Sequence, residues 1–278
     1  MVDEYCKCGQ QFKRPKLNWR SRKRSLGWVP FKATGVRLTA DSVTYGGQTF
    51  RFWNSRPLPG KVRFSSFCED GQGRWYVNFV CEDPTPERTK TGKVAGVDLG
   101  LKTLATLSDG VEFTRENLTR AFEHRLATAQ RARKKKCITR IHARIKNKRK
   151  DWNHKATTRL TNAYDVLAMG NVSTSKLKKT KMAQSVSDAG WADFKTMLSY
   201  KAFRLGTLYQ EVNESFSTVT CPGCKARTGP KGQAGLGVRS WECSGCGVSH
   251  ARDLNAAQNI LNSFRLGYQT LFKEPPRL

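Results

Sequence analysis

An alternation of apolar and polar residues predicts a small antiparallel β domain in the first third of the chain. Short alternating runs are separated by turn-forming pairs such as Gly46-Gly47 and Asp70-Gly71, and a side-chain period of two residues is typical of half-buried strands. The runs lie at 42–45, 49–52, 61–64 and 75–80. We predict an antiparallel β-barrel over residues 27–88, and the same pattern is compatible with a β-sandwich.

The pattern changes after the prolines at 84 and 86, where longer apolar runs alternate with segments of helical spacing. Buried strands are expected at 93–99, 163–169 and 208–216. Helices are expected at 190–205 and 254–264, where apolar residues recur three and four positions apart. This alternation of strands and helices predicts an α/β domain.

One carboxylate interrupts the first of these buried strands. Asp98 follows the apolar run at 94–97 and precedes Gly100, after which a second alternating run predicts a hairpin partner. Removing a carboxylate from water is costly unless it is hydrogen-bonded or holds a metal. Asp98 is therefore a candidate site residue, and a turn-capping aspartate is the alternative.

Two cysteine pairs near the C-terminus predict a zinc site. They form the pattern C-x2-C-x18-C-x2-C, in which two knuckles close one tetrahedral site of four sulfurs. The four candidate ligands are Cys221, Cys224, Cys243 and Cys246. Because all four ligands would be thiolates, the zinc is expected to be structural and not catalytic. The remaining cysteines are expected to be free thiols.

The charge of the chain favours a polyanionic partner. Fifty lysines and arginines oppose twenty-two aspartates and glutamates, which gives a formal net charge of +28 at pH 7. Such an excess, spread along the chain, fits nucleic acid better than an acidic peptide. No apolar run approaches the roughly 18 residues of a membrane-spanning helix, and we see no signal peptide. With the paired cysteines, these features predict a cytoplasmic, nucleoid-associated protein.

The positive charge is densest in a predicted helical segment at 116–160. Few apolar residues recur there at helical spacing, so most of its surface must face solvent or a partner. The residues expected to contact phosphate without reading sequence are Arg131, Arg133, Lys134, Lys135, Lys136, Lys146, Lys148, Arg149 and Lys150. In the β domain, Trp53 and Trp75 are candidates to stack on bases, and burial in the core is the alternative.

Several motifs together resemble the TnpB family, the insertion-sequence nucleases related to type V CRISPR effectors. The resemblance rests on the segment 93–107 with Asp98, the two cysteine pairs and the segment 250–260, and it extends to 27–32 and 171–177. It implies a ribonuclease H-like (RuvC-like) nuclease domain, a preceding wedge-like β-barrel that holds a guide RNA, and an inserted zinc ribbon. The implied domains are a basic arm at 1–26 that is a remnant of a helical recognition region, the barrel at 27–88, the nuclease domain at 89–218, the ribbon at 219–249, and a C-terminal helix and tail at 250–278.

The resemblance also implies a cluster of carboxylates that binds two Mg²⁺ ions, because magnesium prefers hard oxygen ligands. Asp98 and Asp253 match acidic positions of the family, although Asp253 alone could be a helix N-cap. The family's strand at 163–169 ordinarily ends in a glutamate, and Gly170 stands there instead. Glu214, on the adjacent strand, is the candidate replacement, whereas Glu211 is expected to face the other side of the sheet.

The resemblance thus implies an RNA-guided, Mg²⁺-dependent DNA endonuclease of a transposable element, with guide RNA and target DNA as partners. Because Gly170 leaves the usual second acid vacant, a guided DNA-binding protein that has lost cleavage is the first alternative. A truncated transposon relic is the second, since most of the recognition region would lie upstream of Met1; a homodimer or a second subunit would then supply that region. Should Glu214 not be the third acid, Asp165 and Asp109 are the next candidates.

Overall fold

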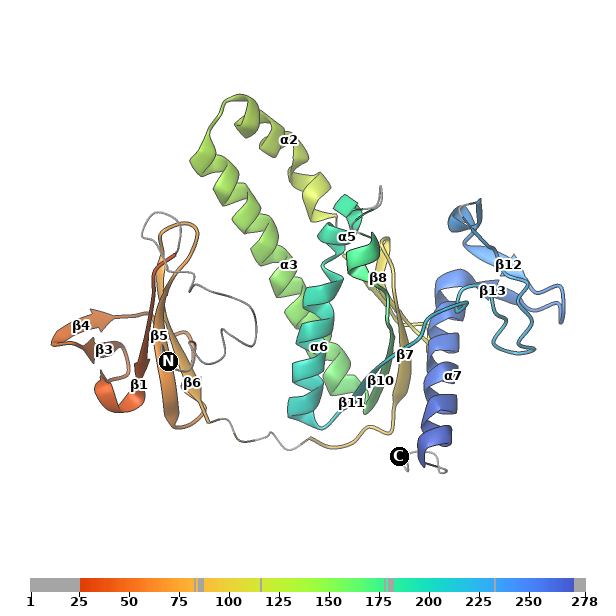
Figure 1. Cartoon of the computed structure of the whole chain (residues 1–278), viewed down its shortest axis with the longest axis horizontal. Helices are drawn as coiled ribbons and strands as arrows, with labels where there is room; N and C mark the ends of the chain where they lie inside the picture. The colour runs from red at the N-terminus through yellow and green to blue at the C-terminus, as the bar shows by residue number, and fades with distance from the viewer. Residues whose placement is uncertain are drawn as a thin grey trace, which may run out of the picture. The chain divides into compact units, whose positions relative to one another are not determined.

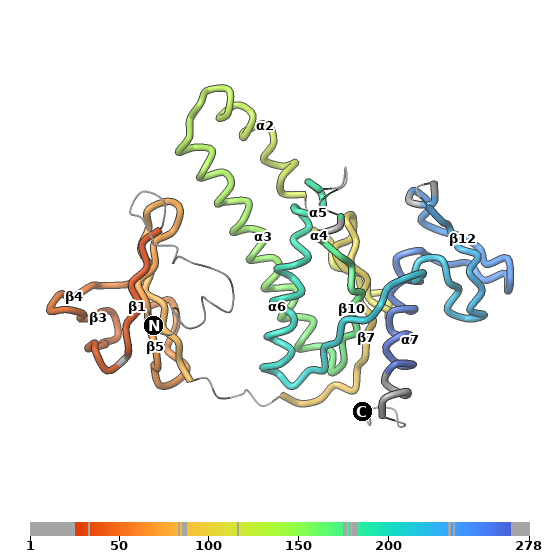
Figure 2. Tube along the Cα trace, viewed as in Figure 1, coloured from red at the N-terminus to blue at the C-terminus, as the bar shows by residue number. Residues whose placement is uncertain are grey.

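The computed structural model describes residues 26–82, 84, 88–115, 117–177, 179, 183–232 and 234–272. The chain divides into two compact units, Met1–Pro84 and Thr85–Leu278, and each is described by itself (Figure 1 and Figure 2). The basic arm expected at 1–26 lies, apart from its last residue, outside the described residues.

The first unit contains two antiparallel sheets of three strands each. One sheet has the order β1-β5-β6, with β1 at Trp28–Lys32, β5 at Val62–Glu69 and β6 at Trp75–Cys81. The other has the order β2-β3-β4, with β2 at Arg37–Leu38, β3 at Ser42–Tyr45 and β4 at Gln48–Arg51, and the short 3₁₀ helix η1 at Ala33–Gly35 precedes it. The predicted antiparallel strands are present. Closure into a barrel is not confirmed, because neither sheet closes on itself in the part of the unit that is described.

Aromatic side chains join the two sheets of this unit. The buried Phe31 ring lies 5.2 Å from that of Tyr45 and 5.0 Å from that of Phe67, and the Phe50 ring also lies 5.0 Å from Phe67. In contrast, Trp53 is 91% exposed and Trp75 is 56% exposed. The alternative that these two tryptophans are core residues is therefore wrong.

The second unit is built on a mixed five-stranded sheet. Its order is β11-β10-β7-β8-β9, with β7 at Val94–Leu99, β8 at Thr103–Leu107, β9 at Glu112–Thr114, β10 at Val166–Gly170 and β11 at Leu208–Val212. Strands β7, β8 and β9 are antiparallel neighbours joined by short turns, whereas β10 is parallel to both β7 and β11. Parallel neighbours need long crossovers, and the helices of the unit form them.

Helices cover both faces of this sheet, as Figure 1 shows. The crossovers contain α2 (Leu118–Arg131), α3 (Lys135–Ala163), α4 (Thr174–Leu177), α5 (Ala183–Ala189) and α6 (Trp191–Leu205), and the last helix is α7 (Arg252–Phe272). On one face, Leu160 of α3 and Phe194 of α6 pack in the main core. On the other, Ile260 and Phe264 of α7 pack against β10. None of the helices in the described residues has the length and hydropathy needed to cross a membrane.

The predicted basic helical segment is a hairpin of α2 and α3. Its own small core joins Leu118 and Phe122 of α2 to Ile141 and Ile145 of α3. The turn between the helices places Arg133 in the left-handed region, with φ 50°. Because this core is narrow, most of the lysines and arginines on the hairpin are exposed, as the pattern predicted.

Helix α7 approaches the central strand β7 more closely than a side chain would allow. A Cβ atom at Gly96 would overlap the backbone carbonyl of Ala257 and would lie 2.8 Å from the backbone nitrogen of Leu261. Because side chains alternate along a strand, Gly96 and Asp98 face α7 while Ala95 and Val97 face the main core. The missing side chain at position 96 therefore sets the distance between α7 and the sheet.

We expect Gly96→Ala to lower the free energy of unfolding by about 1–3 kcal/mol, because the added methyl group must displace helix backbone. Gly267→Ala, on the same helix, is the matched control, since nothing lies within 4 Å of a Cβ atom there. The control should gain about 0.5–1 kcal/mol, because alanine favours the helix. Urea unfolding measures both changes, and equal effects at the two positions would contradict the proposed packing constraint.

Candidate functional site

Three acidic side chains lie within electrostatic range of one another at the edge of the sheet where β7, β10 and the start of α7 come together. Asp98 lies near the C-terminal end of β7, on the α7 side of the sheet, and Asp253 lies in the first turn of α7. Met169 of β10 pairs with Val97, which places Gly170 level with Asp98 on the neighbouring strand. Carboxyl ends of parallel strands share one edge of a sheet, so this edge is where the fold collects them.

Glu214 occupies the space above Gly170. A Cβ atom at Gly170 would overlap Oε2 of Glu214 and would lie 3.2 Å from both the Glu214 Cβ and the Ile260 Cδ1. The carboxylate that follows β11 thus lies where a side chain at position 170 would begin. The absence of a side chain at Gly170 is what makes room for Glu214.

The charges of these groups act on one another. Burial, followed by the negative charges of Glu214 and Asp253, raises the pKa of Asp98 to about 7. Burial also raises the pKa of Glu214, against the opposing effect of the Lys195 charge. Carboxylates that repel one another in a partly dry site provide the hard, negative oxygen ligands that a divalent cation prefers.

The environment of Asp253 links it to the cysteine-rich segment. Nη1 of Arg239 lies 3.4 Å from each carboxylate oxygen of Asp253. The backbone N–H of Arg252 also donates to the carbonyl of Arg239 over 2.8 Å. Asp253 is the second residue of α7 and so is not its N-cap. Its carboxylate lies between the helix and the residue that precedes β12 (Ser240–Glu242).

The other acids that sequence reasoning considered are engaged elsewhere. Glu211 accepts from Lys195 of α6 over 2.6 Å, on the main-core side of the sheet, as its odd spacing from Glu214 predicted. Asp165 accepts from Arg88 and from the backbone N–H of Gly92, each over 2.6 Å. Asp109 accepts from the Tyr164 hydroxyl over 2.5 Å. These contacts hold loops and helix ends in place, so Asp165 and Asp109 are no longer candidates for the third acid.

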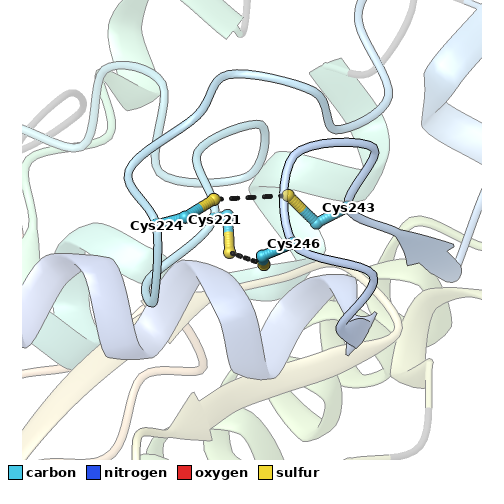
Figure 3. Close-up of side chains that lie close together, drawn as sticks. All are labelled: Cys221, Cys224, Cys243 and Cys246. Atoms are coloured by element: carbon cyan, nitrogen blue, oxygen red, sulfur yellow. Dashed lines mark hydrogen bonds between the residues drawn. The ribbon is translucent and has the colours of Figure 1, made fainter.

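The four paired cysteines converge as the spacing predicted (Figure 3). Their sulfurs all lie within 4.8 Å of one another, with 3.7 Å between Cys221 and Cys246 and 3.5 Å between Cys224 and Cys243. A tetrahedral zinc site with Zn–S bonds of about 2.3 Å needs sulfurs about 3.8 Å apart. The site fits a zinc ion. In the described residues, these four sulfurs are the one group of three or more candidate metal ligands found so close together.

Two short strands and a 3₁₀ helix lie around the four cysteines, and two polar side chains contact their sulfurs. The second pair lies between β12 and β13 (Ser249–Ala251), and the 3₁₀ helix η2 (Ala234–Gly237) precedes β12. The Thr228 hydroxyl donates to the Cys243 sulfur over 3.2 Å, which lowers the pKa of that thiol to about 6. Nε2 of His250 lies 3.2 Å from the Cys221 sulfur, and its ring contacts Trp241 at 4.7 Å. Sequence reasoning missed both neighbours of the thiols, because no local pattern marks them.

Two buried asparagines were also missed. The side-chain amides of Asn255 and Asn259 on α7 each donate to the backbone carbonyls of Ser217 and Thr220, over 2.6 to 3.0 Å. This asparagine clamp attaches the loop after Glu214 to α7. The signal for it was present, since two asparagines four residues apart share one face of a helix that is otherwise apolar.

Two family models match the chain over these elements. One, described as "Probable transposase", matches residues 78–181, and the other, described as "Cas12f1-like, TNB domain", matches residues 191–260. A Streptomyces pristinaespiralis protein named as a candidate RNA-guided DNA endonuclease is 35% identical over 223 residues. The chain belongs to the TnpB family.

The chain is also similar to other proteins. The Escherichia coli protein InsQ, also named as a candidate RNA-guided DNA endonuclease, is 27% identical over 241 residues. These matches cover 74% and 76% of the present TnpB chain but 54% and 59% of the two relatives, so the chain spans little more than half their length. The Cas12f1 chain in a cryo-EM structure of a Cas12f1–sgRNA–target DNA complex aligns with a TM-score of 0.49 and 16% identity, over 89% of this chain and 69% of that one.

The basic residues expected to contact nucleic acid in this TnpB chain fall into two groups. Most are exposed on the α2–α3 hairpin, namely Arg131, Arg133, Lys134, Lys135, Lys136, Lys146, Lys148 and Lys150. Arg149 differs, because it forms a 2.6 Å ion pair with the buried Asp188. Its guanidinium holds α3 against α5, so it is a weaker candidate for phosphate contact than its neighbours.

We expect Cys243→Ser to lose zinc and to unfold the cysteine-rich segment 219–249, because zinc binding provides much of the folding free energy of such small sites. Cys137→Ser is the control, since Cys137 is an exposed free thiol on α3. Zinc is counted by metal analysis of the purified proteins, and ribbon folding by hydrogen exchange of residues 219–249. A full equivalent of zinc in Cys243→Ser would refute the assignment.

We expect Asp98→Asn to stabilise the metal-free protein by clearly more at pH 8 than at pH 5. The folded-state pKa of Asp98 is about 7, above its ordinary value of 3.8. Between these two values the folded state binds a proton that the unfolded state has lost, so stability falls as the pH rises. Asparagine does not ionise, so the variant does not lose stability in this way as the pH rises. The gain at pH 8 should be on the order of 2 kcal/mol, at about 1.4 kcal/mol per pKa unit with an allowance for solvent screening. Thermal unfolding in EDTA measures it, and a gain independent of pH would contradict the electrostatic origin.

Proposed function

We propose that this chain is the nuclease part of an RNA-guided, Mg²⁺-dependent DNA endonuclease of TnpB type. The observation that carries the proposal is the position of the Glu214 carboxylate above Gly170, which is level with Asp98. The negative charges of Glu214 and Asp253 both act on Asp98 and raise its pKa. In this arrangement Asp98, Glu214 and Asp253 are the metal ligands. The four cysteines of the ribbon hold one structural zinc.

The sheet supports a ribonuclease H-like fold for the second unit. Three consecutive antiparallel strands, β7 to β9, are followed by β10, parallel beside β7, and then by β11, parallel beside β10. Helix α7 packs on the opposite face of the sheet from α3 and α6. Ligands in such sheets bind at the carboxyl ends of the parallel strands. Asp98 and the space above Gly170 lie at that edge.

The side chains of the site have separate roles in the proposed chemistry. When bound, Mg²⁺ supplies Lewis acidity at the phosphodiester and neutralises developing negative charge. Asp98 supplies an anionic oxygen from β7 and Glu214 supplies one from the loop after β11, on the far side of β10. The metal-free site holds a proton at Asp98 near neutral pH. Arg239 orients the Asp253 carboxylate through its guanidinium. The asparagine clamp fixes the loop that carries Glu214.

Nucleic acid is the proposed partner of both units. The exposed cations of the α2–α3 hairpin fit contact with phosphate, and the exposed Trp53 and Trp75 of the first unit fit stacking on a guide RNA. We propose guide RNA and target DNA as the nucleic acids, and a second copy of the chain or a second subunit as a further partner. A guided binding protein without cleavage remains the second candidate function, because the usual glutamate is replaced by Gly170.

We expect Glu214→Gln to abolish Mg²⁺-dependent cleavage of a guide-matched DNA while leaving DNA binding intact. Removing one ligand of a metal site costs several kcal/mol of transition-state stabilisation, so the rate should fall by about a thousandfold or more. Glu211→Gln is the matched control, because Glu211 lies three residues away and pairs with Lys195 on the other face. The assay uses the purified chain with RNA transcribed from the flanks of its gene.

The double variant Gly170→Glu with Glu214→Gln separates the two candidate functions. Because the two side chains compete for one space, the pair should restore part of the lost cleavage. Cleavage by Glu214→Gln at the wild-type rate would exclude Glu214 as a ligand. If wild type binds without cutting and Gly170→Glu with Glu214→Gln alone creates cleavage, the guided binder is the correct function.

A further inference from the structure

The loop between Glu214 and the ribbon contains an aromatic residue in an unfavourable backbone conformation. Phe216 has φ 64°, a left-handed conformation that L side chains rarely adopt and that costs of the order of 1 kcal/mol. Its side chain is nevertheless 55% exposed. Burial of the ring therefore does not explain why a phenylalanine is held here.

The surrounding contacts over-determine this conformation. Ser217 N–H donates to the Glu214 carbonyl over 3.0 Å, and the N–H groups of Val219 and Thr220 donate to the Phe216 carbonyl over 3.1 and 3.0 Å. The asparagine clamp fixes the carbonyls of Ser217 and Thr220 from α7. The loop thus presents the ring of Phe216 in a fixed place, and strain of this kind is concentrated at functional sites.

A cation lies directly over the exposed ring. The guanidinium carbon of Arg227 is 4.1 Å from the centre of the Phe216 ring, and Arg227 is itself exposed. An aromatic ring beside a guanidinium is the combination with which proteins hold unpaired nucleobases, because the ring stacks on the base while the cation stacks on it or contacts the adjacent phosphate.

The pair also lies where a nucleic-acid strand would have to pass. Phe216 is two residues from Glu214, so their Cα atoms are within about 7 Å of each other. A phosphodiester that reaches the acidic cluster must bring its flanking nucleotides past this loop. Arg227, on the ribbon side, extends the same surface toward the first cysteine pair.

We propose that Phe216 and Arg227 form a stacking site for an unpaired base of the DNA strand that enters the acidic cluster. This inference rests on the proposed function for the identity of the strand, but the site itself acts by binding and needs no metal. It stacks on bases of any sequence, since every base presents an aromatic face.

The test compares binding of two labelled 15-mer probes by fluorescence anisotropy in EDTA: oligo-dT and an abasic oligonucleotide with the same backbone. Wild type should bind oligo-dT more tightly than the abasic probe. Phe216→Ala should reduce this ratio by about 5- to 150-fold, the range that one base–aromatic stack provides, and Phe216→Trp should preserve it. Phe203→Ala is the matched control, because Phe203 is 90% exposed on α6, and it should leave the ratio unchanged.

Phe216→Gly distinguishes stacking from a structural role of the ring. Glycine accepts a positive φ without strain, so this variant should keep the melting temperature of wild type while losing the preference for bases. A ratio in Phe216→Ala or Phe216→Gly equal to that of wild type would overturn the inference.

The outcomes for the nuclease and for the stacking site are separable. If wild type does not cleave but Phe216→Ala loses the base preference, the stacking site stands and the nuclease proposal fails. If wild type cleaves in Mg²⁺ and Phe216→Ala retains the base preference, the nuclease stands and the stacking site fails.

Discussion

The contact between α7 and the central strand β7 is the constraint on which the site depends. Because Gly96 carries no side chain, the backbone of α7 lies directly against the strand that holds Asp98. The N-terminal turn of the same helix carries Asp253, and its buried face carries Asn255 and Asn259. A helix displaced by the width of a methyl group would separate the acids, and it would also loosen the loop that places Glu214.

This close packing creates an electrostatic cost that only a cation offsets well. Asp98 lies in a partly dry site beside two other carboxylates, and its pKa is raised to about 7 as a result. A fold selected only for stability would gain by replacing it, since unpaired buried charge is unfavourable. The arrangement fits the proposed metal site, which would be less stable without its ion, as is common where stability and chemistry compete. Gly170 contributes to the same arrangement, because the space left by its missing side chain accommodates the Glu214 carboxylate.

The ribbon is connected to the acidic cluster through several independent contacts. Arg239 reaches Asp253, the asparagine clamp holds Ser217 and Thr220, and Arg227 covers Phe216. Each contact joins a residue near the cysteines to a residue near the acids. Zinc bound by four thiolates would stabilise this segment from a distance, since ordering the knuckles also orders the loop and the guanidinium groups that act at the site.

The sequence by itself determined the features that local patterns encode. Cysteine spacing predicted a group of four thiols, strand periodicity predicted that Glu211 and Glu214 face opposite sides of the sheet, and the TnpB resemblance named Asp98 and Asp253. The alternating pattern predicted antiparallel strands in the first unit but not how they assemble, because periodicity specifies which side chains share a face and not which strands are neighbours. The predicted barrel was accordingly not confirmed.

Only the tertiary structure decided the rest, because it depends on distances between segments far apart in the chain. It placed Glu214 over Gly170, removed Asp165 and Asp109 through their hydrogen bonds, and gave Arg149 an ion-pair partner in Asp188. It also showed that the Trp53 side chain is exposed and that the backbone of Phe216 has an unfavourable positive φ. A sequence pattern predicts which side chains of one segment are buried or need a polar partner. Which residue becomes that partner depends on how distant segments pack in the folded chain.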